Sequence, residues 1–122
     1  MRRRSGSGGI VDCLFCKISS GDIPAKIVRE GEHTVAFRDI NPQAPVHVLV
    51  IPRTHYADLG ELSADPVVLA AVAAEAAEVA KAEGVDGTGY RVVFNTGSNA
   101  GQTVFHVHAH VLGGRGLNWP PG

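Results

Sequence analysis

The alternation of apolar and polar residues along the chain predicts five strands. At residues 106–112 the sequence His-Val-His-Ala-His-Val-Leu alternates strictly, as in a half-buried β-strand. Residues 46–52 are almost continuously apolar, which is typical of a central strand buried on both faces. Shorter stretches with strand-like composition cover residues 25–30, 34–39 and 90–95. Gly31 and Glu32 are expected to form the turn between the first two of these stretches.

Two segments have the spacing of helices. A long helix is predicted to follow Asp65 as N-cap, with Pro66 in its first turn, and to end near Glu83 before Gly84. One face of this helix is apolar: Val68, Leu69, Val72, Ala76 and Val79. The opposite side carries Glu75, Glu78 and Lys81. Because alanine fills most other positions, the helix could cover the sheet and also meet a second subunit. A short apolar helical face is expected at Leu14, Phe15 and Ile18.

Composition adds limits to this picture. The chain has 122 residues and a net charge of −1, which fits one domain and gives no electrostatic case for nucleic acid or membrane partners. The longest apolar run is interrupted by Glu75, so no membrane span is expected. Residues 1–11 contain an arginine run and a Gly/Ser-rich stretch, so we expect a flexible tail before a domain at residues 12–122. No apolar stretch follows the arginine run, so we expect no export signal. With only two cysteines and no export signal, we expect free thiols in the cytoplasm.

The three alternating histidines are the main candidates for chemistry. In an extended segment His106, His108 and His110 share one face, roughly 7 Å apart, while the residues between them face the core. Imidazoles that converge in this way are suited to acid/base, nucleophilic or metal chemistry. Hydrogen-bonded core histidines and a site that only binds a metal are the alternatives.

Other polar residues flank these histidines. Residues 96–103 form a Gly-rich turn that is either a plain hairpin loop or a loop whose N–H groups and hydroxyls bind an anion. Its position directly before the histidines favours phosphate. Asp39 at a strand end either caps a turn or binds a diol such as ribose. His47 opens the most apolar strand, where it is either a histidine at the edge of the core or a part of the site.

These features together predict a site for a nucleoside phosphate. A neutral imidazole can attack phosphorus if its other nitrogen keeps a proton and is held by an acceptor. His108 has a histidine on each side and is the candidate nucleophile. His110 and Thr103 would then contact phosphoryl oxygens or pass a proton to the leaving group.

The pair Cys13-x-x-Cys16 has three interpretations. It is half of a zinc site, a redox pair, or two small buried residues. A redox role is least favoured, because no strand of a thioredoxin-type unit precedes the pair. The chain has no second cysteine pair, so histidines would have to complete a zinc site.

The segment at residues 106–112 resembles the His-Φ-His-Φ-His-Φ-Φ signature of the histidine triad (HIT) family, where Φ is an apolar residue. The likeness runs from about residue 12 to the end of the chain. It includes residues 23–27, 39–45, 50–52 and 119–122, which resemble the Hint branch. His110 also favours Hint, since the Fhit-like and galactose-1-phosphate uridylyltransferase branches usually carry glutamine there.

This resemblance implies a fold and an activity. The fold would be α+β and HIT-like, with an antiparallel sheet of about five strands, one long and one short helix, and a homodimer with paired helices at its interface. The activity would be hydrolysis of purine nucleoside phosphoramidates, such as AMP-NH2 or AMP-lysine, through a covalent nucleotidyl-histidine on His108. The partner would be a purine nucleotide of the AMP or GMP class. A non-catalytic nucleotide-binding or regulatory dimer stays an alternative. So does a dinucleoside polyphosphate hydrolase or nucleotidyl transferase, although His110 argues against both.

The resemblance also implies roles for individual residues. His47, His106 and His110 would support the nucleophile, and Asp39 would bind the ribose hydroxyls. The α-phosphate would be held by Asn95, Gln102 and Thr103, the last standing where relatives often have serine. The base would be walled by Leu14, Phe15, Ile18, Phe37 and Ile40. Trp119 would reach the partner subunit's site.

A structural zinc ion is the one cofactor that the resemblance implies. In some bacterial HIT proteins a cysteine pair and two histidines bind zinc, and the matching residues here are Cys13, Cys16, His55 and His106. Two thiolates and two neutral imidazoles are a good tetrahedral ligand set. This role for His106 competes with its role in catalysis.

Overall fold

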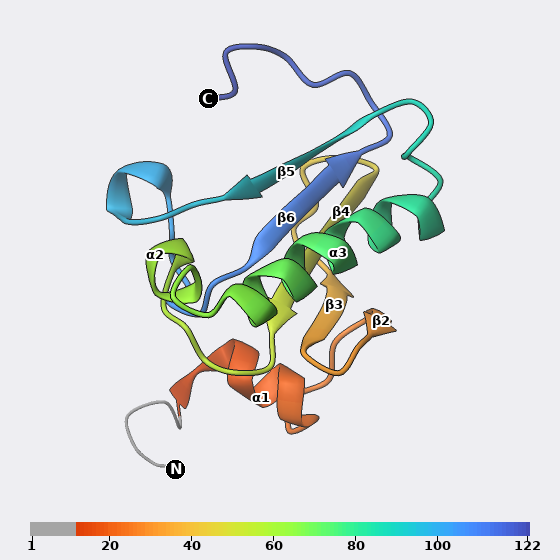
Figure 1. Ribbon diagram of the computed structural model, residues 1–122. Helices are drawn as coiled ribbons and strands as arrows, with labels where there is room; N and C mark the ends of the chain where they lie inside the picture. The colour runs from red at the N-terminus through yellow and green to blue at the C-terminus, as the bar shows by residue number, and fades with distance from the viewer. Residues whose placement is uncertain (1–11) are drawn as a thin grey trace.

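The computed structural model describes residues 12–122, which form an antiparallel five-stranded sheet with helices packed against it (Figure 1). The strands lie in the order β2-β3-β4-β6-β5. Their bounds are β2 (Ile27–Glu30), β3 (Thr34–Arg38), β4 (Val46–Pro52), β5 (Tyr90–Phe94) and β6 (Ala109–Gly113). The helices are α1 (Leu14–Ser20), α2 (Leu59–Leu62) and α3 (Pro66–Ala82), with a 3-10 turn, η2 (Ser98–Ala100). This confirms the expected α+β sheet; the tail expected at residues 1–11 lies outside the described residues.

Strand β4 is the centre of the sheet, as its apolar sequence predicted. Every residue of β4 after Val46 is buried, and the strand pairs with β3 on one side and β6 on the other. The register places Leu49 opposite both Phe37 and His110. These three side chains therefore lie on the same face of the sheet, where the functional site is built.

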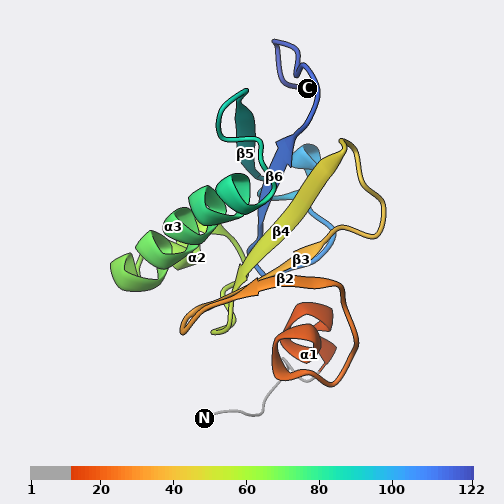
Figure 2. The same ribbon diagram turned by 90° about the vertical axis from the view of Figure 1, so that its right-hand side faces the viewer.

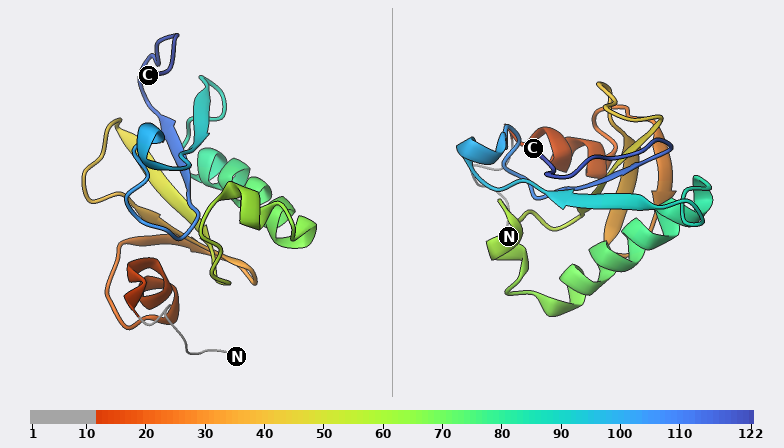
Figure 3. Two further views of the ribbon diagram at one scale, coloured as in Figure 1. Left: turned by 90° about the vertical axis from the view of Figure 1, so that its left-hand side faces the viewer. Right: turned by 90° about the horizontal axis from the view of Figure 1, so that it is seen from above.

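The sheet separates two hydrophobic cores. Helix α3 crosses one face obliquely (Figures 2 and 3). Its Val72 and Val79 belong to the same core as Val48 and Val111 of the sheet. The other core is smaller and contains Phe15 from α1, together with residues of β3 and β4. Helix α1 lies beside the β2 end of the sheet (Figure 2). The two faces thus differ: the larger core lies between α3 and the sheet, and α1 on the other face borders the histidines.

Helix α3 begins and ends close to the predicted residues. The Asp65 side chain accepts a hydrogen bond from the Val68 N–H, and Gly84 follows with φ of +75°. Glu75 was predicted to lie with Glu78 and Lys81 on the polar side of the helix. This was wrong, because Glu75 is only 7% exposed. Its carboxylate is bound by the guanidinium of Arg29 and by the hydroxyl of Thr34, at 3.2 Å. Sequence periodicity misses this burial because the compensating partners come from two strands distant in the chain.

The histidine segment becomes a strand later than predicted. Strand β6 begins at Ala109, and residues 106–108 approach it as irregular backbone. The Val107 N–H donates to the Tyr56 carbonyl at 2.7 Å, a partner in a loop rather than in β4. The predicted alternation nevertheless holds, since Val107, Ala109 and Val111 are all buried in the α3-side core.

Two smaller differences concern the start of β2 and an additional short helix. Strand β2 begins at Ile27 rather than residue 25, and its register against β3 shifts between Ile27 and Arg29. Helix α2 was not predicted; its N-cap Asp58 accepts a hydrogen bond from the Glu61 N–H.

Within the described residues, no helix has the length and apolar character that crossing a membrane requires.

Candidate functional site

Three histidine rings meet on the α1-side face of the sheet. His47 comes from β4 and His110 from the neighbouring β6, and the distance from His47 Nε2 to His110 Nδ1 is 2.9 Å. The centroids of the His108 and His110 rings are 4.9 Å apart. The adjacent strands therefore bring together two of the histidines that the sequence singled out, His47 and His110, and His108 lies beside them just before β6.

The His108 ring is held in one tautomer by the backbone. Its Nδ1 lies 2.8 Å from the main-chain oxygen of His106, and a carbonyl oxygen can only accept a hydrogen bond. Nδ1 therefore carries the proton, and in the neutral ring Nε2 keeps a free lone pair. This is the arrangement that a nucleophilic imidazole needs, with the proton on the far nitrogen and an acceptor that orients it.

The tautomer of His47 follows from the same reasoning. Its Nδ1 accepts the main-chain N–H of Gln43 at 3.0 Å, so a neutral His47 carries its proton on Nε2. That proton points to His110 Nδ1 and to Asp39 Oδ2, which lies 3.3 Å away. When His110 Nδ1 accepts this hydrogen bond, the neutral His110 ring carries its own proton on Nε2. The chain from Gln43 to His47 to His110 thus leaves an N–H donor on a ring whose centroid lies 4.9 Å from that of His108.

Burial keeps this histidine pair neutral near pH 7. Removal from water, with the neighbouring His108 and His47 as smaller causes, lowers the pKa of His110 to about 4. Removal from water also lowers the pKa of His47, although the charge of Asp39 opposes that shift. Both rings therefore act as hydrogen-bonding groups rather than as cations.

Asp39 has a structural contact and a second contact toward the site. Its Oδ1 accepts the main-chain N–H of Asn41 at 2.8 Å, which is the turn-capping role considered from the sequence. Its Oδ2 faces His47. A role in binding a ribose stays a prediction, to which the half-buried side chain leaves access.

The Gly-rich loop is organised by Gln102. This side chain is 6% exposed, and its amide oxygen accepts the Gly97 N–H at 3.0 Å. Its Nε2 donates to the carbonyls of Ala57 and Val104, at 2.8 and 3.1 Å. Both amide donors are therefore used within the protein, and a donor bond from Gln102 to a phosphate would break one of these contacts. Thr103 is exposed and Asn95 half-buried.

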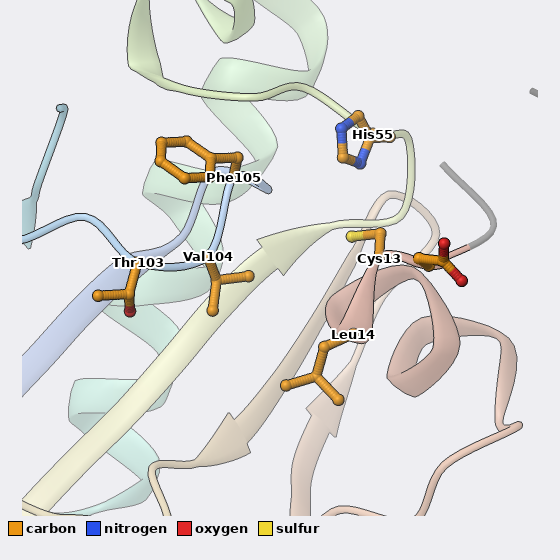
Figure 4. A pocket seen from close by; sticks show the side chains of 7 residues that line it. Cys13, Leu14, His55, Thr103, Val104 and Phe105 are labelled. Carbon is orange, nitrogen blue, oxygen red and sulfur yellow. The ribbon is translucent and has the colours of Figure 1, made fainter. Parts of the chain in front are cut away.

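Thr103 lines a pocket of about 430 Å³ (Figure 4). Leu14 and Val104 lie on its walls, Phe105 stands beside Val104, and Cys13 and His55 border it (Figure 4). The sequence offered no signal for Val104 and Phe105, because apolar residues in a loop have no periodicity to interpret. The same holds for the Gln43 N–H, which is a backbone group.

The predicted base-binding residues fall into two groups. Phe15 and Phe37 are buried, 5% and 4% exposed, and their rings meet edge to face with centroids 5.4 Å apart. Ile18 is half-buried, Leu14 is 44% exposed and Ile40 is fully exposed. The first pair forms the floor of the site, whereas the second group is accessible to a ligand. Trp119 is 82% exposed in the C-terminal segment.

A second cluster contains two cysteines and two histidines. The Nδ1 atoms of His55 and His106 are 3.2 Å apart. Cys13 Sγ lies 3.4 Å from His106 Nδ1, and Cys16 Sγ lies 3.4 Å from His55 Nδ1 and 3.5 Å from His106 Nδ1. A tetrahedral zinc ion requires about 3.5 Å between sulfur and nitrogen ligands and about 3.3 Å between two nitrogens. The four residues that the resemblance suggested therefore fit zinc in both donor type and spacing.

The protonation states of the cluster fit the same ion. His106 Nε2 donates to the Pro52 carbonyl at 2.8 Å, so the lone pair of a neutral ring is on Nδ1, toward the cysteines. Burial lowers the pKa of His106 to about 4 and lowers that of His55. Burial, with the neighbouring Cys13 as a smaller cause, raises the pKa of Cys16 to about 12, so zinc binding would have to release this proton. The side chain of His106 thus belongs to this cluster, and its main chain contacts His108.

Comparison with known proteins agrees with this geometry. The family model described as HIT domain matches residues 20–117. The chain belongs to the HIT family. A HIT family hydrolase from Legionella pneumophila, solved by crystallography, superposes with a TM-score of 0.88 at 50% identity, covering 91% of this chain and all of that one.

Two curated relatives extend the comparison. An uncharacterised HIT-like protein of Synechococcus elongatus is 49% identical over 112 residues, which is 91% of this HIT chain and 97% of the relative. The 14 kDa zinc-binding protein of Zea mays is 46% identical over 112 residues, covering 89% and 87% of the two chains. A histidine triad nucleotide-binding protein from Candida albicans superposes with a TM-score of 0.79 at 35% identity, covering 89% of this chain and 83% of that one.

Proposed function

We propose that this HIT protein hydrolyses purine nucleoside phosphoramidates, as members of the Hint branch do. The observation that carries the proposal is the fixed tautomer of His108, which keeps Nε2 unprotonated on a ring that lies beside His110 of the His47–His110 pair. The solved Legionella pneumophila relative is described as a hydrolase, which supports an enzyme at the coarser level. His110 rather than glutamine at the third triad position supports phosphoramidates over dinucleoside polyphosphates.

The reaction would proceed in two displacement steps. His108 Nε2 attacks the α-phosphorus. The bond from phosphorus to the leaving amine breaks as the bond from phosphorus to His108 Nε2 forms. The charge on the nucleotidyl-imidazolium is stabilised by the hydrogen bond from Nδ1 to the His106 carbonyl. His110 or the Thr103 hydroxyl gives a proton to the departing nitrogen. Water then attacks phosphorus, releases the nucleoside monophosphate and returns the proton, so that one water is consumed in all.

The nucleotide would lie across the exposed part of the site. Asp39 binds the ribose hydroxyls, and Asn95 and Thr103 bind the α-phosphate together with backbone N–H groups of the Gly-rich loop. Leu14, Ile18 and Ile40 contact the base above the floor formed by Phe15 and Phe37. We assign Gln102 to shaping the loop, since its amide donors are already used.

We further propose a zinc ion on Cys13, Cys16, His55 and His106. Bound there, zinc would supply structural stability by holding α1 to the segment that precedes β6. The Zea mays relative is named a zinc-binding protein, which supports this assignment. Thiolate ligands require reducing conditions, which is consistent with our expectation of a cytoplasmic protein.

A homodimer through α3 and β5 completes the proposal. A groove of about 180 Å³ between them is lined by small and apolar residues: Val72, Ala73, Ala76, Ala77, Tyr90, Val92, Phe94 and Ala109. Tyr90 and Val92 on the edge strand are 38% and 41% exposed. Edge strands and apolar patches of this kind are usually covered, and a second copy would cover both. Trp119 would then reach the partner subunit's site.

The decisive experiment measures AMP release from adenosine 5′-phosphoramidate. We expect turnover by the wild type and a loss of at least about a thousandfold in His108→Ala with nucleotide binding retained. His33→Ala is the matched control, since His33 is the histidine that lies outside both clusters. A folded wild type that binds AMP without turnover would contradict the proposed phosphoramidate hydrolysis and favour a nucleotide-binding regulatory role.

A further inference from the structure

Phe15 stands between the two clusters in sequence and in space. It is 5% exposed and lies between Cys13 and Cys16 in the chain. Its ring meets the His108 ring edge to face, with centroids 5.1 Å apart and planes at 86°. It also lies beside His106, with centroids 6.1 Å apart. One aromatic ring therefore contacts both a proposed metal ligand and the proposed nucleophile.

The position of Phe15 depends on a helix that is too short to be stable alone. Helix α1 has seven residues, whereas isolated helices need more than about twelve. Its first turn is closed by Cys13, whose sulfur accepts the Cys16 N–H at 3.4 Å. Tertiary contacts must therefore hold α1, and its N-cap Cys13 and its Cys16 provide them on the side toward the site, where they face His106 and His55.

His106 provides a second connection between the clusters. Its ring is fixed at both nitrogens, with Nδ1 facing the cysteines and Nε2 donating to Pro52. Its carbonyl oxygen is the acceptor that keeps the proton of His108 on Nδ1. A shift of the His106 ring that its side-chain torsions do not absorb moves this backbone, and with it the acceptor that determines the tautomer of His108.

We propose that Phe15 is a positioning residue for the nucleophile, and that a metal on the four ligands sets the position of both Phe15 and the His106 carbonyl. A half-turn of the His108 ring about its Cβ–Cγ bond would exchange Nδ1 for a carbon atom at the acceptor. The edge-to-face contact with Phe15 opposes that rotation. The inference rests on the proposed function for the identification of His108 as nucleophile, but the state of its ring can be measured without substrate.

The test compares Phe15→Leu with Val35→Ala at pH 8, both loaded with zinc. Val35 is buried in the same core as Phe15, so this control loses a similar amount of packing without removing the ring. Long-range proton–nitrogen NMR spectra of the imidazoles report the His108 tautomer. We expect one Nδ1–H tautomer in the wild type and in Val35→Ala. In Phe15→Leu, with zinc content unchanged, we expect a mixture of tautomers and a kcat about tenfold lower at similar KM.

The outcomes separate the alternatives. A Phe15→Leu protein that binds zinc, keeps the single tautomer and raises only KM would overturn the inference and make Phe15 a wall of the base pocket. Absence of turnover in the wild type would remove the proposed function, while the tautomers would still decide the role of Phe15.

The effect of zinc on the His108 ring is tested by comparing the zinc-loaded and the chelated protein. Chelated wild type should show the same mixture of His108 tautomers, and readdition of zinc should restore the single form. A folded, metal-free protein with an unchanged His108 spectrum would overturn this part. If chelation unfolds the chain, the Cys13→His variant is used instead of chelation. It keeps four ligands, while its longer side chain displaces the start of α1. An unchanged spectrum in that zinc-loaded variant would also overturn it.

Discussion

At the scale of single residues, hydrogen-bond partners distinguish histidines that look equivalent in the sequence. His106, His108 and His110 follow the same alternation, yet their rings donate to or accept from different partners. The Pro52 carbonyl directs His106 to the cysteines, and the His106 carbonyl directs the Nε2 of His108 away from the backbone. The alternation predicted that these residues share a face, but it could not predict these tautomers, because the partners are backbone groups.

The lowered pKa of His110, which pairs with the buried His47, predicts how stability depends on pH. An unfolded histidine has a pKa near 6.5, whereas burial lowers that of His110 to about 4. Between these values the unfolded chain binds more protons, so stability is full above about pH 6.5 and falls as the pH drops toward 4. We expect His110→Gln to lose less unfolding free energy than the wild type between pH 7.5 and 5, by at most about 2 kcal/mol. Urea unfolding at both pH values measures this difference, and equal losses would contradict it.

Gln102 carries a prediction about the Gly-rich loop. Its truncation to alanine removes the amide that satisfies Gly97, Ala57 and Val104, and should cost about 1–3 kcal/mol of unfolding free energy. The Gly97 amide should also exchange its hydrogen faster, because its acceptor is lost. Thr103→Ala is the control, since Thr103 is exposed and its change should reduce turnover with little effect on stability. Unchanged exchange at Gly97 in Gln102→Ala would argue against this role.

At the scale of elements, the sequence predicts where strands and helices lie better than where they begin and what they bury. The apolar run of β4 and the cap at Asp65 act locally, so their signals were sufficient. The start of β6 depends on Tyr56, and the burial of Glu75 depends on Arg29 and Thr34. Such long-range partners leave no periodic signal. The metal ligands illustrate the same limit, because His55 is isolated in the sequence and only the family resemblance suggested it.

Helix α3 offers a direct test of the buried carboxylate. Glu75→Ala leaves Arg29 and Thr34 without their partner, and we expect a loss of about 1–3 kcal/mol because Arg29 retains access to water. Glu78→Ala on the same helix removes an exposed pair with Lys81 and should cost less than about 0.5 kcal/mol. Chemical denaturation of both variants measures the difference. Similar losses in the two would show that the Glu75 network contributes little.

At the scale of the whole molecule, the two faces of the sheet perform different tasks. One face and its short helix α1 carry both polar clusters, so the site is formed where the smaller core meets the loops. The other face carries α3, and there the alanine-rich helix and the edge strand β5 leave apolar side chains exposed. An assembly through β5 and α3 would therefore extend the sheet without covering the histidines.

The assembly can be tested by placing a charge in the groove between α3 and β5. Val92→Glu puts a carboxylate among apolar groove residues, where a partner would remove it from water at a cost of several kcal/mol. We expect sedimentation equilibrium to give a dimer for the wild type and a monomer for Val92→Glu. Val67→Glu is the control, because Val67 is 65% exposed on α3 and does not line the groove. If Trp119 completes the partner's site, Val92→Glu should also lower kcat/KM, and Trp119→Ala should reproduce that decrease in a protein that stays dimeric. A wild type that is monomeric at working concentration would remove both expectations.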